Sequence, residues 1–225
     1  MKYPDFAQTR GWNACFFPAA HKRLPVKSPC PTIGVVHDMA PWYELKRREY
    51  LNAIKRLLLP SALRRMDRII AVSDWIKQEL VHITGIKESK IDVVPNGIDV
   101  KAFHPRPPGG DSELLIQPFS FSRPYILYAS RLEHPVKNHV KLIEAFDIFK
   151  ETTKYPHRLV LAGGDSRGVE KIREAARYSS HRNDIFFTGH FPGASLPELY
   201  ACSDLVVIPS MYEGFGTGVL EAMAS

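Results

Sequence analysis

The chain has 225 residues, of which 44% are hydrophobic and 11% aromatic, so it can form one large or two small globular domains. Its three cysteines, Cys15, Cys30 and Cys202, form no CxxC pair, which argues against a zinc or redox motif. The formal net charge of +6 is concentrated between Lys46 and Arg68, without a recognised nucleic-acid-binding motif, so we expect no nucleic-acid partner.

No apolar run approaches the roughly 18 residues of a membrane-spanning helix. Residues 1–10 also lack the apolar centre of a secretory signal, so we expect a cytoplasmic protein. The basic stretch, residues 44–68, interleaves cations with leucines at helical spacing, and can bind an anionic membrane surface or lie as a solvated face on its own domain. Its cations are Lys46, Arg47, Arg48, Lys55, Arg56, Arg64, Arg65 and Arg68.

Short apolar runs alternate with helical patterns along the chain. Strands are predicted at Thr32–His37, Arg68–Ser73, Ile91–Pro95, Tyr125–Ser130, Arg158–Gly163, Asp184–Gly189 and Asp204–Pro209. Helices are predicted between them at Glu44–Leu59, Asp74–Thr84, His139–Thr153, Gly168–Ser179, Leu196–Cys202 and Gly214–Ser225, with Ser73 as an N-cap. The strands are apolar on both faces, which is typical of a buried parallel sheet in an α/β protein.

A proline- and glycine-rich segment divides the chain near its middle. We therefore predict a partial N-terminal Rossmann-like domain over residues 1–108, a linker over 109–124 and a partial C-terminal Rossmann-like domain over 125–225. No strong strand precedes Thr32, and the last helical pattern lacks a stop signal. Both features lead us to expect a chain that is cut short at its C-terminal end and also at its N-terminal end.

The segment SMYEGFGTGVLEA follows the last predicted strand and opens the last predicted helix. Glu213 precedes this helix, and Glu221 is eight positions later, about two turns into it. Gly214 and Gly216 between them allow a ligand to approach the backbone closely. The free N–H groups at the helix start suit a phosphate, and the two carboxylates can accept hydrogen bonds from sugar hydroxyls.

A second segment, SRLEHPVKNH, follows the predicted strand Tyr125–Ser130. Its cations Arg131 and Lys137 are expected at the carboxyl edge of a parallel sheet, where open α/β folds bind their ligands. A planar guanidinium and a compact ammonium both suit a diphosphate. In the N-terminal half, His37 ends a predicted strand and would place an imidazole facing the cleft.

These segments resemble the pattern of glycosyltransferase family 4 in the GT-B superfamily. EGFGTGVLEAMA looks like the family's EX7E motif, and SRLEHPVKNHVKLIEAF looks like its diphosphate-binding segment. TIGVVHDMAPW, IIAVSDWIKQEL, VVPNGIDVKAF, RLVLAGG and ELYACSDLVVIPS complete the series in the family's order. The resemblance covers residues 24–225 and implies a fold of two Rossmann-like domains. It also implies a retaining hexosyltransferase that uses a nucleoside diphosphate sugar and a glycan or lipid-linked acceptor, with no metal and no cofactor.

The resemblance assigns a role to individual residues. Arg131 and Lys137 would neutralise the diphosphate of the leaving group, as preorganised electrostatic stabilisation. Glu213 would contact the transferred sugar, and His37 would touch that sugar from the acceptor side. The donor-binding set comprises Ser130, Gly214, Phe215, Gly216 and Glu221, with Glu221 on the nucleotide ribose.

Two departures from the family pattern leave other functions open. The glycine-rich loop after the family's first strand has no counterpart here, and the AGG at Ala162–Gly164 does not replace it. The segment that follows the EX7E helix is also missing, so the fragment can be inactive. The alternatives are a non-catalytic nucleotide-sugar-binding or membrane-docking module, and a sugar-nucleotide epimerase of the same architecture.

Overall fold

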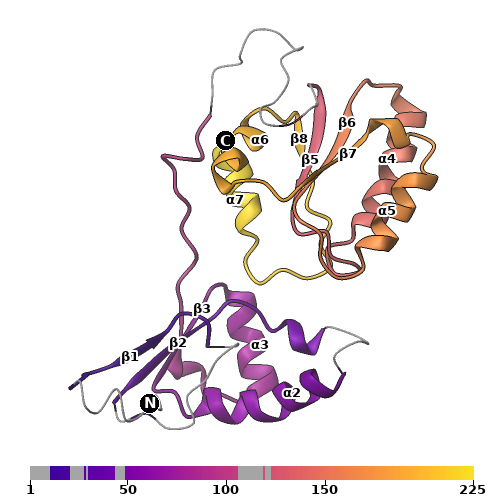
Figure 1. Ribbon diagram of the computed structural model, residues 1–225. Helices are drawn as coiled ribbons and strands as arrows, with labels where there is room; N and C mark the ends of the chain where they lie inside the picture. The colour runs from indigo at the N-terminus through magenta and orange to yellow at the C-terminus, as the bar shows by residue number, and fades with distance from the viewer. Residues whose placement is uncertain (1–10, 21–27, 29, 44–48, 106–118, 120–122) are drawn as a thin grey trace. The chain divides into compact units, whose positions relative to one another are not determined.

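The computed structural model describes residues 11–20, 28, 30–43, 49–105, 119 and 123–225 (Figure 1). The chain divides into two compact units. Unit 1 comprises Met1–Gly97 and Glu213–Phe215, and unit 2 comprises Ile98–Tyr212 and Gly216–Ser225. Each unit contains a four-stranded parallel sheet with helices packed on it, which confirms the predicted α/β fold of two Rossmann-like domains.

The sheet of unit 1 has the order β1-β2-β3-β4. Its strands are β1 (Cys15–Phe17), β2 (Thr32–Val36), β3 (Arg68–Ala71) and β4 (Ile91–Val93). The helices are α2 (Glu49–Arg64) and α3 (Asp74–Thr84), with short 3-10 turns η1 (Ala40–Trp42) and η2 (Glu88–Lys90). Leu63, Ile69, Ile76 and Leu80 are fully buried, so both helices contribute to the core on this sheet.

One short strand precedes Thr32, which the sequence pattern did not reveal: β1 pairs in parallel with β2 from Cys15↔Thr32 onward. This strand is only three residues long and Phe16 is exposed, so its sequence lacks the continuous apolar run of a central strand. Helix α2 also ends at Arg64 rather than Leu59, since Leu63 continues its buried stripe past Pro60.

The N-cap prediction at Ser73 is confirmed. The Ser73 hydroxyl accepts a hydrogen bond from the Ile76 amide at 3.2 Å, which satisfies one of the free N–H groups at the start of α3. Gly85 ends the same helix in the left-handed conformation, with a φ of 66°. Local sequence signals therefore fix both ends of this helix.

The basic stretch lies on α2 and β3, with residues 44–48 outside the described part of the chain. Arg64 donates a hydrogen bond to the Thr84 carbonyl at 2.8 Å, and Arg68 donates one to the Ser89 carbonyl at 2.7 Å. Leu57 and Leu58 are exposed on α2. Contact with a membrane surface stays a prediction. Among the described residues, no helix combines the length and the apolar character needed to cross a bilayer.

The sheet of unit 2 has the order β7-β6-β5-β8. Its strands are β5 (Tyr125–Ala129), β6 (Arg158–Ala162), β7 (Ile185–Gly189) and β8 (Leu205–Val206). The helices are α4 (His139–Thr153), α5 (Val169–Tyr178), α6 (Leu196–Ala201) and α7 (Thr217–Ala224), with 3-10 turns η3 (Arg182–Asp184) and η4 (Gly193–Ser195). One core joins β5 and β6 to α4 and α5, and a second joins the same strands to α6.

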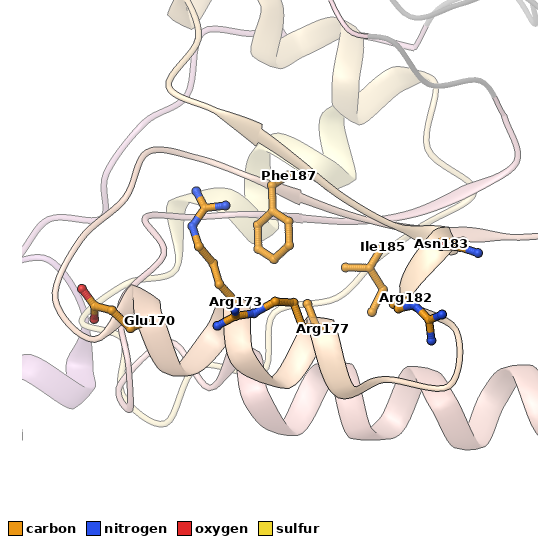
Figure 2. A pocket seen from close by; sticks show the side chains of 8 residues that line it. Glu170, Arg173, Arg177, Arg182, Asn183, Ile185 and Phe187 are labelled. Carbon is orange, nitrogen blue, oxygen red and sulfur yellow. The ribbon is translucent and has the colours of Figure 1, made fainter.

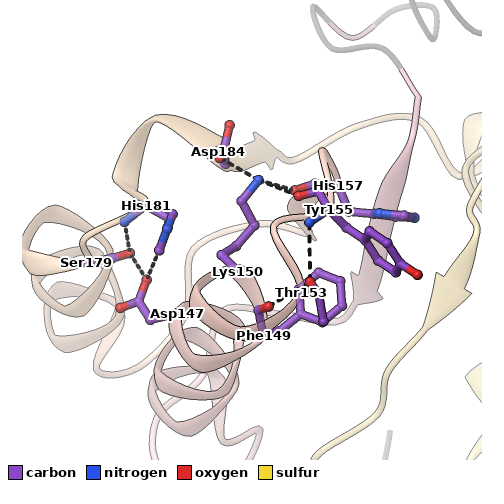
Figure 3. A network of polar contacts seen from close by, with 9 residues as sticks. All are labelled: Asp147, Phe149, Lys150, Thr153, Tyr155, His157, Ser179, His181 and Asp184. Carbon is purple, nitrogen blue, oxygen red and sulfur yellow. Dashed lines mark hydrogen bonds and ion pairs between the residues drawn. The ribbon is translucent and has the colours of Figure 1, made fainter.

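A polar network connects α4 to the segments around β7 (Figure 3). Asp147 accepts hydrogen bonds from the Ser179 hydroxyl at 2.5 Å and from the His181 ring at 3.2 Å. The Lys150 ammonium pairs with Asp184 at 2.8 Å and donates to the His157 carbonyl at 3.1 Å. These contacts fix the C-terminal half of α4 against the segment between α5 and β7 and against the residues before β6.

The last predicted strand, Asp204–Pro209, is regular only over Leu205–Val206. Val207 still donates to the Leu127 carbonyl at 2.9 Å, but the Pro209 carbonyl instead accepts a hydrogen bond from the Asn138 side chain at 3.2 Å. The chain therefore leaves the sheet toward the loop that follows β5.

The predicted linker, residues 109–124, falls mostly outside the described residues. Phe103, upstream of it, packs edge-on against Tyr200 of α6 at a centroid distance of 6.0 Å. That contact agrees with the start of unit 2 at Ile98. The proposed boundary within 109–124 stays a prediction.

Candidate functional site

The order of strands in unit 2 creates a topological switch point. The chain passes from β5 to β6 and β7 on one side, and then returns to β8 on the other side of β5. All these strands are parallel, so the carboxyl ends of β5 and β8 lie side by side. Ligands of open α/β folds bind outside the carboxyl ends of strands at such a point.

The cationic loop, residues 130–138, follows β5 and carries both predicted cations. The Arg131 guanidinium pairs with the Glu133 carboxylate at 3.2 Å, and Glu133 also lies 3.7 Å from Arg167. The Arg131 side chain is 72% exposed, whereas that of Glu133 is 14% exposed, so the carboxylate is held inside and the cation points outward. The Lys137 amide donates to the Glu133 carbonyl at 3.2 Å. Arg131 and Lys137 thus lie on one loop that leads into α4.

Backbone hydrogen bonds hold the cationic loop along the end of β6. The Ser130 amide donates to the Ala162 carbonyl at 2.9 Å, and the Leu132 amide donates to the Gly164 carbonyl at 3.0 Å. Gly163 lies between them with a φ of 153°, and a Cβ there would be 2.0 Å from the Ser130 carbonyl oxygen. The AGG segment therefore permits a close approach to the cationic loop, which the sequence analysis did not anticipate.

The glycine-rich segment, residues 209–216, follows β8 and contacts the cationic loop. The Met211 amide donates to the Val136 carbonyl at 2.9 Å. The Tyr128 hydroxyl donates to the Lys137 carbonyl at 3.0 Å and lies 2.8 Å from the Ser210 hydroxyl. Two predicted ligand segments that are far apart in sequence are thus joined at the switch point. Tyr128 was not a predicted site residue, because a tyrosine in an apolar strand looks like core.

Gly216 and Glu221 lie at the start and on the second turn of α7. Gly216 precedes the helix in the left-handed conformation, with a φ of 81°. Glu221 is half-buried, and this burial raises the pKa of its carboxyl group, while the hydroxyl of Tyr200 acts in the opposite direction. A half-buried carboxylate can accept hydrogen bonds from a diol, and the ribose contact of Glu221 stays a prediction.

The remaining predicted residues belong to unit 1. His37 follows β2, and its Nε2 donates a hydrogen bond to the Pro18 carbonyl at 2.8 Å. Glu213, Gly214 and Phe215 are also part of unit 1, whereas Gly216 and Glu221 are part of unit 2. The roles predicted for His37, Glu213, Gly214 and Phe215 stay predictions.

An open cavity of about 590 Å³ lies between α5 and the edge strand β7 (Figure 2). Arg173 lies over the Phe187 ring at 5.1 Å and pairs with Asp165 at 2.8 Å. Arg177 and Arg182 line the same cavity. None of the predicted site residues lines it, so it is separate from the candidate site at the switch point.

His139 is a buried neighbour of the predicted residue Ser130. It is the first residue of α4, is fully buried, and its Nε2 is hydrogen-bonded to the Ser130 hydroxyl at 3.2 Å. The Tyr128 ring packs on it at a centroid distance of 4.7 Å. Burial, which disfavours the charged ring, lowers the pKa of His139 to about 4. His139 is therefore neutral at pH 7 and supports the cationic loop without adding charge.

Because His139 is buried in its neutral form, we predict that the folded protein becomes less stable as the pH falls. Below pH 6.5 the unfolded chain binds a proton on His139, whereas the folded chain binds it only near pH 4. The free energy of unfolding should therefore fall by about 3 kcal/mol as the pH is lowered through this window. Chemical denaturation between pH 4 and 7 measures the effect. His139→Gln should flatten the dependence and His190→Gln, at an exposed position, should keep it; a wild-type slope in both would contradict the prediction.

Comparison with protein-family models and known proteins places these segments in context. Residues 2–102 match the model described as Glycosyltransferase Family 4, and residues 116–225 match the model described as Glycosyl transferases group 1. The mannosylfructose-phosphate synthase of Agrobacterium fabrum is 27% identical over 168 residues, which are 72% of this chain and 37% of that protein. The serotype-specific mannosyltransferase WbdA of Escherichia coli is 28% identical over 205 residues, which are 87% of this chain and 24% of that protein.

Solved structures share the fold. Anabaena Alr3699/HepE, solved in complex with UDP and glucose, matches with a TM-score of 0.72 at 19% identity, covering 98% of this chain and 59% of that one. The chain therefore spans less than two thirds of each of these relatives.

Proposed function

Because the chain belongs to the family 4 and group 1 glycosyltransferases of the GT-B fold, we propose that its protein transfers a hexose from a nucleoside diphosphate sugar to a glycan or lipid-linked acceptor. Configuration at the transferred sugar is retained. One observation carries the proposal: the cationic loop and the glycine-rich segment, joined by hydrogen bonds, flank the switch point between β5 and β8. A diphosphate-linked sugar is a ligand that such a pair of segments can hold.

The chemistry follows from the charges of these segments. As the bond between the sugar and the diphosphate breaks, negative charge accumulates on the diphosphate and the sugar becomes oxocarbenium-like. Arg131, Lys137 and the N-terminus of α4 present positive charge to the leaving group and need no rearrangement during the step. Glu221 holds the ribose. Glu213 contacts the transferred sugar, and His37 contacts that sugar from the acceptor side.

The relatives suggest the donors with which to test the proposal. HepE was solved with UDP and glucose, and WbdA is named a mannosyltransferase. UDP-glucose and GDP-mannose are therefore the first donors to try, with UDP and GDP as the binding probes. A relative named an O-antigen chain mannosyltransferase suggests a growing polysaccharide as the acceptor.

Isothermal titration calorimetry with UDP, GDP, UMP and GMP tests the donor site directly. The protein should bind one diphosphate at least about 10-fold more tightly than the matching monophosphate, because the second phosphate meets the cations of the loop. The preference should shrink as the salt concentration rises. Equal affinity for the diphosphate and the monophosphate would contradict the proposed site, and absence of binding to all four nucleotides would reject the function.

A further inference from the structure

Two tyrosines of β5 are buried alike but serve different neighbours. Tyr125 is 0% exposed and Tyr128 is 1% exposed. The Tyr125 hydroxyl donates a hydrogen bond to the Leu199 carbonyl in α6 at 2.7 Å. The Tyr128 hydroxyl instead reaches the cationic loop and the glycine-rich segment, through Lys137 and Ser210. The two phenols thus share their strand and their degree of burial, but their hydroxyl groups hold different segments and their rings pack in different cores of unit 2.

The direction of the hydrogen bonds at Tyr128 follows from valence. A phenol has one proton, and the Lys137 carbonyl can only accept, so Tyr128 donates to Lys137 at 3.0 Å. The Ser210 hydroxyl, 2.8 Å away, must then donate to the phenol oxygen. A relay runs from Ser210 through Tyr128 to the backbone of Lys137. It crosses 82 residues of sequence between Tyr128 and Ser210.

This relay fixes the spacing of the two segments that flank the switch point. Lys137 supplies one of the cations for the diphosphate, and Ser210 begins the turn that leads to Gly216 and α7. The Tyr128 ring is itself held in place, because it packs on the buried His139 at a centroid distance of 4.7 Å. Small shifts of either segment change how well one ligand can contact both.

We propose that Tyr128 is a positioning residue of the donor site, which holds Lys137 and the glycine-rich segment at the separation that a nucleoside diphosphate requires. The inference rests on the proposed function. Tyr128 acts through the backbone of Lys137 and through Ser210, and it lies beneath the ligand rather than against it. Loss of its hydroxyl therefore weakens binding without removing any group that contacts the diphosphate.

A matched pair of variants tests this role, because Tyr128→Phe and Tyr125→Phe each remove one buried hydroxyl from the same strand. Both should lower the melting temperature by a similar amount. In calorimetry with UDP and GDP, Tyr128→Phe should raise the Kd of the bound nucleotide about 10-fold. Tyr125→Phe should leave that Kd within about twofold of the wild-type value. A Kd that is equally changed, or equally unchanged, in the two variants would overturn the inference.

Ser210→Ala provides a second approach that leaves the core intact. It should also raise the Kd, and the double variant Ser210→Ala/Tyr128→Phe should bind no more weakly than Tyr128→Phe alone, because both changes break one relay. If the losses of binding free energy in the two single variants add up in the double variant, the proposed relay is wrong. If Tyr128→Phe fails to fold, Ser210→Ala alone decides, and an unchanged Kd rejects the inference. A wild-type protein that binds neither UDP nor GDP would reject the proposed function instead.

Discussion

Replacing Lys137 with alanine should lower kcat for sugar transfer about 100- to 1,000-fold. This is the loss expected when one preorganised group that meets developing charge is removed. Lys137 is well placed for that role, since it is half-buried and its carbonyl is held by Tyr128 at 3.0 Å. It also comes two residues before α4, whose N-terminal dipole adds positive charge. In the proposed mechanism the charge of the diphosphate grows in the transition state, so kcat should fall more than KM rises.

The matched control is Lys141→Ala, four residues further along the chain and within α4. Lys141 is exposed, and its ammonium pairs with Glu144 at 2.6 Å, one turn along α4. Its removal should leave kcat within about twofold of wild type, since an exposed ion pair contributes little. The measurement is the steady-state release of nucleoside diphosphate from UDP-glucose or GDP-mannose, whichever the wild-type protein turns over. Equal rates for Lys137→Ala and wild type would remove Lys137 from the mechanism.

Much of the sheet architecture could be predicted because its strands carry continuous apolar runs. Ile126 and Leu127 of β5, and Leu159 and Val160 of β6, are buried on opposite faces, so periodicity identifies them as central strands. Strand β1 has no such run. It pairs with β2 through contacts such as the hydrogen bond from the Cys15 amide to the Pro31 carbonyl at 2.8 Å, and a single-sequence pattern does not contain such contacts.

The candidate site was predictable where function depends on residue type. Arg131 and Lys137 are cations after an apolar strand, and the parallel sheet places that strand's end at the ligand edge. Tyr128 and His139 carry no such signal, because both look like ordinary core residues. Their hydrogen bonds are to Ser210 and Ser130, which the fold brings to them. Buried residues that support a candidate site are therefore harder to find from sequence than charged residues at the ligand edge of a sheet.

Gly163→Ala should destabilise the protein by about 3 kcal/mol and weaken nucleotide binding with it, because no side chain fits at this position. The backbone has a φ of 153°, which L-residues rarely adopt, and the added methyl would lie 2.0 Å from the Ser130 oxygen and 2.7 Å from the Ser130 carbonyl carbon. Both are backbone atoms, so neither can rotate away. The first residues of the cationic loop must move, and the hydrogen bond from the Ser130 amide to Ala162 must lengthen.

Gly193→Ala is the control, since its added methyl meets no atom within 4 Å and its φ is not positive. Chemical denaturation should show a free energy of unfolding within about 0.5 kcal/mol of wild type for Gly193→Ala, and the full loss for Gly163→Ala. Calorimetry with UDP or GDP then distinguishes displacement of the cationic loop from loss of stability in Gly163→Ala. A displaced cationic loop raises the Kd at temperatures where the variant is still folded, whereas pure destabilisation leaves the Kd unchanged there. Equal stability of the two variants would show that Ser130 can retreat, and that its close approach to Gly163 does not fix the loop.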